Sequence, residues 1–596
     1  MKKNTLYVAI ATALLSAPVC AEETETMVIT ANRVEQNKFD VMASVDVITR
    51  EDIQLIQPVS VVDLLNRTSG VTFVQQGGAA NTTSIFMRGT NSNQVLILID
   101  GARVGSATLG QKSIQDLSPT QIDRIEVVKG PRAALYGSDA IGGVIQIFTR
   151  DLAPNQFNLG GGYGSNNTAQ FDAAGGFELF GSRNTMSITG QKSDGFSVTD
   201  AEPDDDGYER GAVSLKGDYQ VGKVLSFDWM GLIEKGDYDF DGGFENQKDY
   251  RNHLVQIGTT ADLGQTILRL EIGQSEDEQN GYGNGIGKGD GSLYQTTINQ
   301  LSANVTHSIN DDFTVILGAD LQDQEVDSSD PIAVDERTVE GYYAGLTGEV
   351  GQFLAEAAVR YDDIEHVDSE TTYNLSAGYK FSPNWLVSLN YGTGFKAPSF
   401  NDLYSPWGGN QDLVPETSDT VELLLKGNLD LVSIEFAAYN TNIDDLIEWA
   451  PIAPGNPNWT PTNLSSAEIK GIDLTLSTSL FDIEHQLTAT LLDAENKTTK
   501  EDLIRRPSQK FTYAASYAYN QWNVSGDLSY NSDAEDSYGA KLHSYSLLNV
   551  FAGYEFDNNF TVRAYGRNML DKDYSGAIGY NTAGREVGLT VTLQNY

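Results

Sequence analysis

The chain has 596 residues, with 58 glycines, 28 tyrosines, 23 phenylalanines and a single cysteine. Its 82 acidic residues outnumber its 39 lysines and arginines, which gives a formal net charge of -43. So acidic a chain offers no basic surface, and no nucleic-acid partner is expected. One cysteine excludes a disulfide scaffold, and beyond the N-terminus no apolar run is long enough for a membrane-spanning helix. The composition instead favours a large, β-rich protein.

The first 21 residues predict a secretory signal peptide. Two lysines follow the initial methionine, a mostly apolar stretch comes next, and a plausible cleavage site ends at Ala21. The alternative is a lipoprotein anchor on Cys20. That alternative is weaker, because Val19 stands where a small residue is usual. We therefore expect residues 1–21 to direct the chain out of the cytoplasm.

Residues 37–150 mix strand-like and helix-like segments. Val45–Thr49, Gln94–Ile99 and Arg124–Val128 predict short strands. Ser60–Asn66 predicts a short amphipathic helix. Glycine-containing turns separate these segments. The region is therefore predicted to form a small α+β domain.

Residues 151–596 show repeated alternation of apolar and polar side chains with a period of two. In one such stretch Trp522 and Val524 alternate with Asn523 and Ser525. This period is typical of strands that have one apolar and one wetted face. Together with export, its repetition favours an all-β transmembrane barrel with lipid on the apolar face. The alternative, a secreted β-sandwich array or β-helix, does not explain polar residues facing inward throughout.

The length of this region predicts the size of the barrel. At roughly 20 residues for each strand and connection, residues 151–596 form about 22 antiparallel strands, and barrels of that size have a plugged lumen. The barrel must close, because an open edge in lipid would leave backbone groups unpaired. We therefore expect the α+β domain of residues 37–150 to fill the lumen as a plug.

Four motifs resemble those of TonB-dependent outer-membrane receptors. Residues 88–91 (RGTN) and 129–145 (KGPRAALYGSDAIGGVI) resemble plug motifs of the family. Residues 392–400 (GTGFKAPSF) resemble the matching barrel motif, and residues 568–574 (NMLDKDY) resemble its penultimate turn. The resemblance implies a multi-pass barrel in the outer membrane, surrounded by lipid and lipopolysaccharide. It also implies that TonB is the partner on the periplasmic side.

The segment that follows the predicted signal peptide resembles the TonB box of this family. It lies in a predicted linker, residues 22–36, before the plug begins. In such receptors the box pairs with TonB as an added strand, through main-chain hydrogen bonds. A β-prone heptamer alone is usually just a strand, so the position in the chain carries the assignment. The predicted box consists of Glu25, Thr26, Met27, Val28, Ile29, Thr30 and Ala31.

Within the family the chain most resembles cobalamin receptors. The shared stretches are residues 84–91, the long plug motif and residues 580–586 (YNTAGRE). The resemblance implies uptake of cobalamin or another corrinoid, energised by the inner-membrane proton gradient through TonB, with a periplasmic corrinoid-binding protein downstream. The alternative within the family is a receptor for a ferric siderophore or haem. A passive porin or adhesin would need neither plug nor TonB box, and no catalytic motif supports an enzyme.

The resemblance also implies which residues face the ligand. Corrinoids carry amide side chains and an extended planar face, so hydroxyls, neutral donors and aromatic rings suit them. A ferric siderophore site would more often show clustered arginine and tyrosine. One contact is an aromatic residue where the family has a small one (Phe240), and Tyr538 is a weaker placement. The implied contacts are Thr82, Ser84, Asn91, Leu109, Gly110, Phe240, Arg505 and Tyr538.

Two acidic stretches, residues 200–206 and 237–242, suggest a cation site. The second copies the start of a calcium loop, but Lys248 at the twelfth position excludes an EF-hand. Clustered carboxylates still suit calcium, while the alternative is a solvated acidic face. The resemblance implies calcium that orders the outer loops, with Ser197 in place of one family aspartate. The implied ligands are Glu202, Asp204, Asp206, Tyr238 (through its backbone), Asp239 and Asp249.

Two arginines of the plug motifs, Arg88 and Arg132, need compensation if the plug lies inside a barrel. A buried charge must be paired or wetted. Glu416 and Glu422 follow Pro415 on the predicted barrel and are the candidate partners. The alternative is that both arginines simply line water in the lumen.

Overall fold

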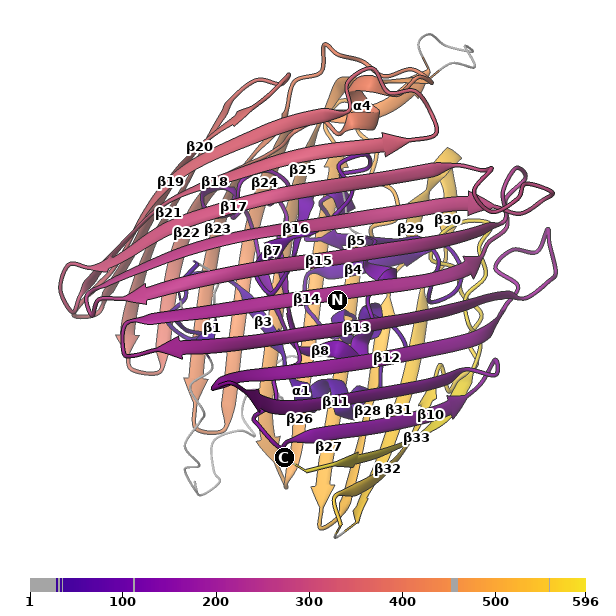
Figure 1. Cartoon of the computed structure of the whole chain (residues 1–596), viewed down its shortest axis with the longest axis horizontal. Coiled ribbons are helices and arrows are strands. Elements are labelled where there is room, and N and C mark those ends of the chain that lie inside the picture. The colour runs from indigo at the N-terminus through magenta and orange to yellow at the C-terminus, as the bar shows by residue number, and fades with distance from the viewer. Residues whose placement is uncertain are drawn as a thin grey trace, which may run out of the picture.

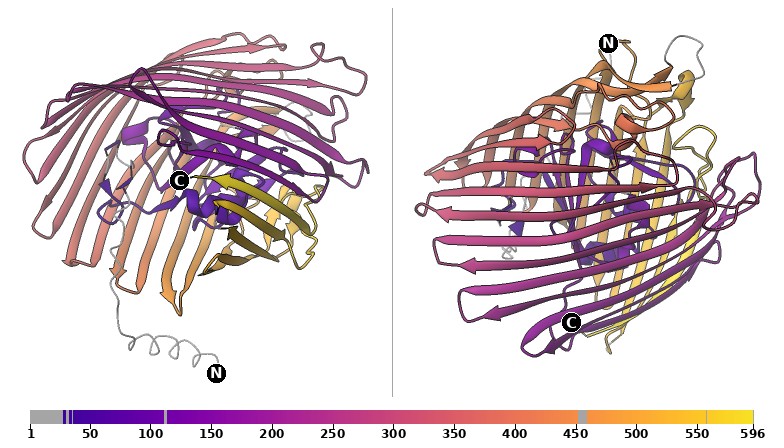
Figure 2. Two further views of the ribbon diagram at one scale, coloured as in Figure 1. Left: turned by 60° about the horizontal axis from the view of Figure 1, so that its bottom comes forward. Right: turned by 45° about the horizontal axis from the view of Figure 1, so that its top comes forward.

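The computed structural model describes residues 28–29, 33–34, 36–110, 113–451, 459–556 and 558–595. It consists of a closed β-barrel with a smaller domain inside it, which Figures 1 and 2 show from three directions. The predicted signal peptide lies outside the described residues, as does the predicted TonB box apart from Val28 and Ile29. Within the described part of the chain, no helix is both long enough and apolar enough to cross a membrane.

The barrel has 22 antiparallel strands, which confirms the predicted class and size. Consecutive strands pair with each other, and the first strand, β10, pairs with the last, β33, to close the wall. The strands are β10 (Phe157–Gly164), β11 (Ala169–Leu179), β12 (Ser182–Phe196), β13 (Asp206–Val221), β14 (Leu225–Asp239), β15 (Gln247–Asp262), β16 (Thr266–Tyr282), β17 (Leu293–Ser308), β18 (Phe313–Ser328), β19 (Glu336–Val350), β20 (Phe353–Ile364), β21 (Glu370–Ser382), β22 (Trp385–Lys396), β23 (Glu416–Leu429), β24 (Val432–Pro451), β25 (Trp459–Leu480), β26 (Ile483–Asn496), β27 (Gln509–Tyr519), β28 (Trp522–Asn531), β31 (Tyr545–Phe556), β32 (Phe560–Arg567) and β33 (Glu586–Gln594).

The two-residue period of the sequence sorts side chains between the two faces of the wall. On β28, Val524 and Leu528 are 48% and 47% exposed on the outer face, whereas Ser525 and Asp527 are buried against the interior. Aromatic rings gather near the strand ends, where Trp522 and Tyr554 lie 4.9 Å apart between ring centroids. An apolar outer band flanked by aromatic rings is the arrangement that a lipid bilayer requires.

The two ends of the barrel differ in the length of their connections. At one end turns such as residues 180–181 and 430–431 join neighbouring strands directly. At the other end residues 197–205 and 397–415 form long loops, the second of which lies around α4 at the top of Figure 1. In outer-membrane barrels the short turns face the periplasm and the long loops face outward, so the long-loop end is the extracellular mouth. It also carries α4 (Phe400–Tyr404), β29 (Ala534–Asp536), η4 (Ser537–Gly539) and β30 (Ala540–Leu542).

The domain inside the lumen is built on a mixed five-stranded sheet in the order β3-β8-β9-β6-β7, in which only β6 and β9 are parallel. The predicted strands and the predicted short helix are all present. The elements are β3 (Val45–Ile48), α1 (Arg50–Ile56), α2 (Val61–Leu65), β4 (Val71–Gln75), β5 (Thr83–Met87), η1 (Ser92–Gln94), β6 (Val95–Ile99), β7 (Ala102–Arg103), η2 (Ile114–Asp116), η3 (Pro119–Gln121), β8 (Ile122–Lys129), α3 (Ala133–Tyr136) and β9 (Gly143–Thr149).

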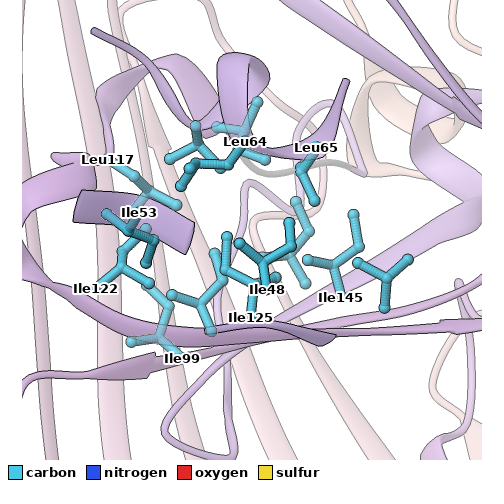
Figure 3. Close-up of a cluster of buried hydrophobic side chains, with 14 of the residues drawn as sticks. Ile48, Ile53, Leu64, Leu65, Ile99, Leu117, Ile122, Ile125 and Ile145 are labelled. Carbon is cyan, nitrogen blue, oxygen red and sulfur yellow. The ribbon is translucent and has the colours of Figure 1, made fainter. Parts of the chain in front are cut away.

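Helix α1 begins where the sequence supplies a cap. The Thr49 hydroxyl accepts a hydrogen bond from the Asp52 backbone N–H, and the Asp52 carboxylate accepts one from the Thr49 N–H. Such a capping box satisfies amide groups that the first turn leaves unpaired. The helix then directs Ile53 and Ile56 into the apolar core against the sheet, which Figure 3 shows.

The plug contacts the barrel wall through buried charges, among them Arg88. Its guanidinium lies 2.6 Å from Glu422 and 3.0 Å from Asp473 of the wall, over the ring of Tyr439. Burial opposes the charged form, yet the two carboxylates raise the pKa of Arg88 above its ordinary value. The predicted pairing of Arg88 with Glu422 is therefore confirmed, with Asp473 as a second partner that sequence reasoning missed.

The prediction for the other carboxylate was wrong. Glu416 is buried and accepts hydrogen bonds from the Gln94 side chain and the Ile447 N–H rather than from an arginine. Arg132 instead lies 3.3 Å from Glu356 on β20. Because neutral donors already satisfy the hydrogen-bonding capacity of the Glu416 carboxylate, no arginine of the plug is required as its partner.

The first residues that the structure describes come just before the plug domain in the chain. Strand β1 (Val28–Ile29) pairs with β2 (Gln36–Asn37). Between them the Arg33 guanidinium lies 3.0 Å from Asp320 and donates a hydrogen bond to the Tyr343 hydroxyl, both on the barrel wall. The connection between the predicted TonB box and the plug is therefore fixed to the wall by a half-buried ion pair.

Candidate functional site

The predicted ligand contacts of the plug differ in how open they are to solvent. Thr82 is exposed just before β5, and Leu109 is 53% exposed on the turn that the hydrogen bond from Gly110 N–H to Ser106 closes. Ser84 and Asn91 are half-buried, Ser84 within β5 and Asn91 as the cap of η1. Thr82 and Leu109 can therefore meet a ligand directly, while Asn91 is already engaged by a residue of the barrel.

That residue is Arg506, which sequence reasoning missed. It donates hydrogen bonds to the Gly89 carbonyl, at 3.1 Å, and to the Asn91 side chain, and its guanidinium lies 4.2 Å from the centre of the Phe86 ring. Burial and the neighbouring charge of Arg505 lower the pKa of Arg506 to about 9. The Arg-Arg doublet was visible in the sequence, but only the loop conformation decides which of the two meets the plug.

The predicted ligand contact Arg505 forms an ion pair with another loop residue and does not contact the plug as Arg506 does. Its Nε atom lies 2.6 Å from Oδ1 of the buried Asp536. Burial favours the protonated carboxyl, but hydrogen bonds from the Ile578 and Ser537 N–H groups and the charge of Arg505 hold the pKa of Asp536 below its usual value. Arg505 thus joins separate extracellular loops. The side chain of the remaining barrel contact, Tyr538, lies outside what the structure describes.

Phe240 lies where the acidic loops meet the plug. It is half-buried, and its ring centroid is 6.2 Å from that of Tyr238. In the preceding acidic loop, Val198 packs so closely on Gly77 of the plug that any side chain at residue 77 would collide with it. The apolar cluster around Phe240 also includes Ala79, Ala80, Tyr208 and Tyr250. Ordering of the acidic loops therefore bears directly on the plug apex.

Three carboxylates of the acidic loops converge. Side-chain oxygens of Glu202, Asp204 and Asp241 all lie within 4.8 Å of one another, with the first two residues exposed and the third half-buried. Oxygen ligands from flexible loops suit calcium, which accepts irregular geometry. Asp241 belongs to the calcium-like motif of the sequence but was not among the predicted ligands, because the family pattern placed the role on Asp239.

The other predicted metal ligands have protein partners. The Asp206 carboxylate accepts a hydrogen bond from the Val198 N–H at 2.8 Å, and Asp239 accepts one from a glutamine side chain at 2.9 Å. Asp249 lies 3.5 Å from a lysine of the next loop. The Tyr238 side chain is buried. Among the described residues, the cluster within 4.8 Å thus contains only two of the six predicted ligands.

Two family descriptions match the chain, and together they cover most of its length. The description "TonB-dependent Receptor Plug Domain" matches residues 37–144. The description "TonB dependent receptor-like, beta-barrel" matches residues 145–569.

Curated relatives align over the whole chain. The protein called "Vitamin B12 transporter BtuB" from Photobacterium profundum is 33% identical over 612 residues, covering 100% of both chains. The protein of the same name from Vibrio vulnificus is 31% identical and covers 97% of this chain and 96% of its own.

Solved structures share the fold at lower identity. The siderophore receptor PirA from Acinetobacter baumannii has a TM-score of 0.80 at 18% identity, covering 92% of this chain and 98% of its own. The ferric enterobactin receptor PfeA from Pseudomonas aeruginosa has a TM-score of 0.82 at 16% identity, covering 93% of this chain and 100% of its own.

Proposed function

Because the chain belongs to the TonB-dependent receptor family, a family of outer-membrane β-barrel receptors, we propose that it imports cobalamin or a related corrinoid with energy supplied through TonB. The observation that carries the proposal is the full-length similarity, at 31–33% identity, to proteins named as vitamin B12 transporters. The siderophore receptor PirA and the ferric enterobactin receptor PfeA share only 18% and 16% identity, and that likeness concerns the fold alone.

The residues proposed as ligand contacts at the extracellular mouth support this proposal through their chemistry. Thr82 and Ser84 offer hydroxyls, Asn91 offers the NH2 group of an amide whose oxygen Arg506 binds, and Leu109 offers an exposed apolar surface. Neutral polar groups around an apolar face suit a large ligand with amide side chains. The arginine that reaches the plug apex, Arg506, hydrogen-bonds backbone and amide oxygens, an arrangement unlike a site built to hold a highly charged ferric siderophore.

The ligand class is tested by titrating the purified full chain with cyanocobalamin and, separately, with ferric enterobactin. We expect saturable binding of cyanocobalamin and none of the siderophore at the same concentrations. Cobalamin-dependent growth of a strain that lacks its own cobalamin receptor provides the functional readout. Binding of ferric enterobactin without binding of cyanocobalamin would overturn the proposal in favour of the siderophore alternative.

Calcium is proposed as a cation that orders the loops. Glu202, Asp204 and Asp241 crowd negative charge together, and without a cation their repulsion opposes a compact arrangement. The same loops contact the plug through Val198 and Phe240. A bound calcium ion would therefore order the loops before the ligand arrives, so that less of the ordering cost falls on ligand binding.

Removing calcium is expected to weaken cobalamin binding about tenfold, and cobalamin should raise the affinity for calcium by the same factor. The measurement is a cyanocobalamin titration in chelator and in millimolar calcium. Glu202→Gln combined with Asp241→Asn should abolish the difference between the two conditions. Asp368→Asn, an exposed carboxylate of another extracellular loop, is the matched control and should retain it. Equal affinities for the unsubstituted protein in both conditions would mean that the acidic loops are only a solvated face.

Arg506→Met is expected to weaken corrinoid binding about tenfold, because the Gly89–Asn91 turn loses two hydrogen bonds and its contact with the barrel. Isothermal titration with cyanocobalamin measures the loss. Lys500→Met removes an exposed cation from the same loop and should leave affinity unchanged. If the two variants bind equally well, Arg506 does not position the plug apex for the ligand.

A further inference from the structure

A line of exposed apolar side chains marks the extracellular edge of the lipid-facing band on strands β12 to β17. Each stands on the outer face of its strand, and the next outward-facing residue toward the extracellular end is polar, charged or glycine. These strands lie nearest the viewer in Figure 1. The line steps from strand to strand, as tilted strands in a flat bilayer require. It consists of Ile188, Val213, Ile233, Val255, Ile272 and Leu301, which are between 37% and 61% exposed.

Two basic residues lie just beyond this edge, side by side on β14 and β15. Lys235 is the first outward-facing residue beyond Ile233, and Arg251 is its direct cross-strand partner. Both side chains are exposed. Like charges directly opposite each other destabilise a sheet, and cations are scarce in a chain with a net charge of -43. The pair therefore calls for a compensating anion.

Within the described residues, the nearby carboxylates do not form ion pairs with these two cations. Neither Lys235 nor Arg251 forms an ion pair there, whereas the exposed Lys192 and Lys470 each have a carboxylate within 3.3 Å. The carboxylate of Glu278, directly opposite Arg251, accepts a hydrogen bond from an asparagine side chain at 2.9 Å instead. Two exposed cations thus remain available at the height where lipid headgroups begin.

We propose that Lys235 and Arg251 form a binding site for the phosphate groups of lipopolysaccharide in the outer leaflet. Guanidinium groups bind phosphate through paired hydrogen bonds, and an ammonium group adds a second positive charge. Toward the membrane, Ile233 on β14 and, beyond His253, Val255 on β15 present apolar surface to the acyl chains of the same lipid. This site follows from the outer-membrane location of the barrel and does not depend on which ligand the receptor imports.

The surrounding groups limit the site to a single headgroup. His253 follows Arg251 on the outer face of β15, and its Nδ1 atom lies 3.3 Å from Glu276. Farther out, Asp237 and Asp249 are direct cross-strand partners. These carboxylates restrict the positive field to a small area, so a compact phosphate group fits where a broad anionic surface would be repelled.

The test measures binding of bisphosphorylated lipid A to the full chain in detergent by native mass spectrometry. Lys235→Gln combined with Arg251→Gln should weaken binding about thirtyfold, because each basic residue near an anionic lipid surface contributes a factor of about five. Lys470→Gln, which removes an exposed but paired cation, should have no effect. The charge-preserving exchange of Lys235→Arg with Arg251→Lys should restore most of the binding.

Two further probes separate a lipid site from a site for free phosphate. Dephosphorylated lipid A should bind the unsubstituted protein as weakly as bisphosphorylated lipid A binds the double glutamine variant. Pyrophosphate should show no binding at the concentrations that saturate lipid A. Equal lipid A binding by the double variant and the Lys470→Gln control would overturn the proposal, and so would pyrophosphate binding as tight as that of lipid A. Unchanged heat-modifiable migration confirms that each variant is folded.

Discussion

Val28→Pro is expected to abolish TonB-dependent uptake while leaving ligand binding at the extracellular mouth unchanged. Pairing with TonB by strand addition needs an extended backbone with free N–H donors, and proline removes one donor and fixes φ. Val28 precedes the plug, and the proposed ligand contacts begin only at Thr82. The measurements are cobalamin-dependent growth and a cyanocobalamin titration of the same variant.

Val28→Ile is the matched control, because isoleucine keeps both the donor and the preference for an extended backbone. It should support normal growth. Normal growth of the proline variant would show that the segment from Glu25 to Ala31 is not the TonB box. Loss of ligand binding in the proline variant would show instead that the substitution disturbs the plug.

Arg88→Leu is expected to destabilise the docking of the plug by about 3–5 kcal/mol, because it leaves the carboxylates of Glu422 and Asp473 buried without their cation. The urea concentration at which a protease first cuts the plug of the detergent-solubilised protein reports this loss. Each of the two carboxylates contacts the arginine from a different barrel strand, so the variant loosens the plug from β23 and β25 together.

Arg183→Leu is the control for this experiment. Its ion pair with Asp218 is on the exposed surface, with 59% of the arginine side chain accessible, and such pairs contribute about 1 kcal/mol or less. The urea concentration at which the protease first cuts should fall more for Arg88→Leu than for Arg183→Leu. An equal fall in the two variants would mean that the plug is not held by its buried charges.

The barrel could be predicted from the sequence because the pattern that produces its strands is visible within each short stretch of the chain. Every strand needs alternating side chains to separate lipid from lumen, and residues such as Val524 and Ser525 show that alternation without any knowledge of their neighbours. The short plug helix was predictable for a similar reason, since its start is marked locally by Asp63, whose carboxylate accepts hydrogen bonds from the Val59 and Ser60 N–H groups.

The contacts between plug and wall were harder to predict because they join residues hundreds of positions apart. Arg88 and Asp473 are 385 residues apart, and only closure of the barrel brings β25 next to the plug. Glu416 looked like a partner for arginine, but its place in the wall faces Gln94. Likewise, Asp241 joins Glu202 and Asp204 only because two separate loops fold toward each other.

The pairing of β10 with β33 places the closing seam of the barrel between the first strand after the plug and the last strand of the chain. During synthesis the plug sequence is therefore complete long before the wall can close, since Glu586–Gln594 emerges last. The order of the chain allows the plug to be enclosed as the wall forms around it, with no need to thread it into a finished cylinder. A chain interrupted before β33 would leave an open sheet whose edge backbone groups find no hydrogen-bond partner in the membrane.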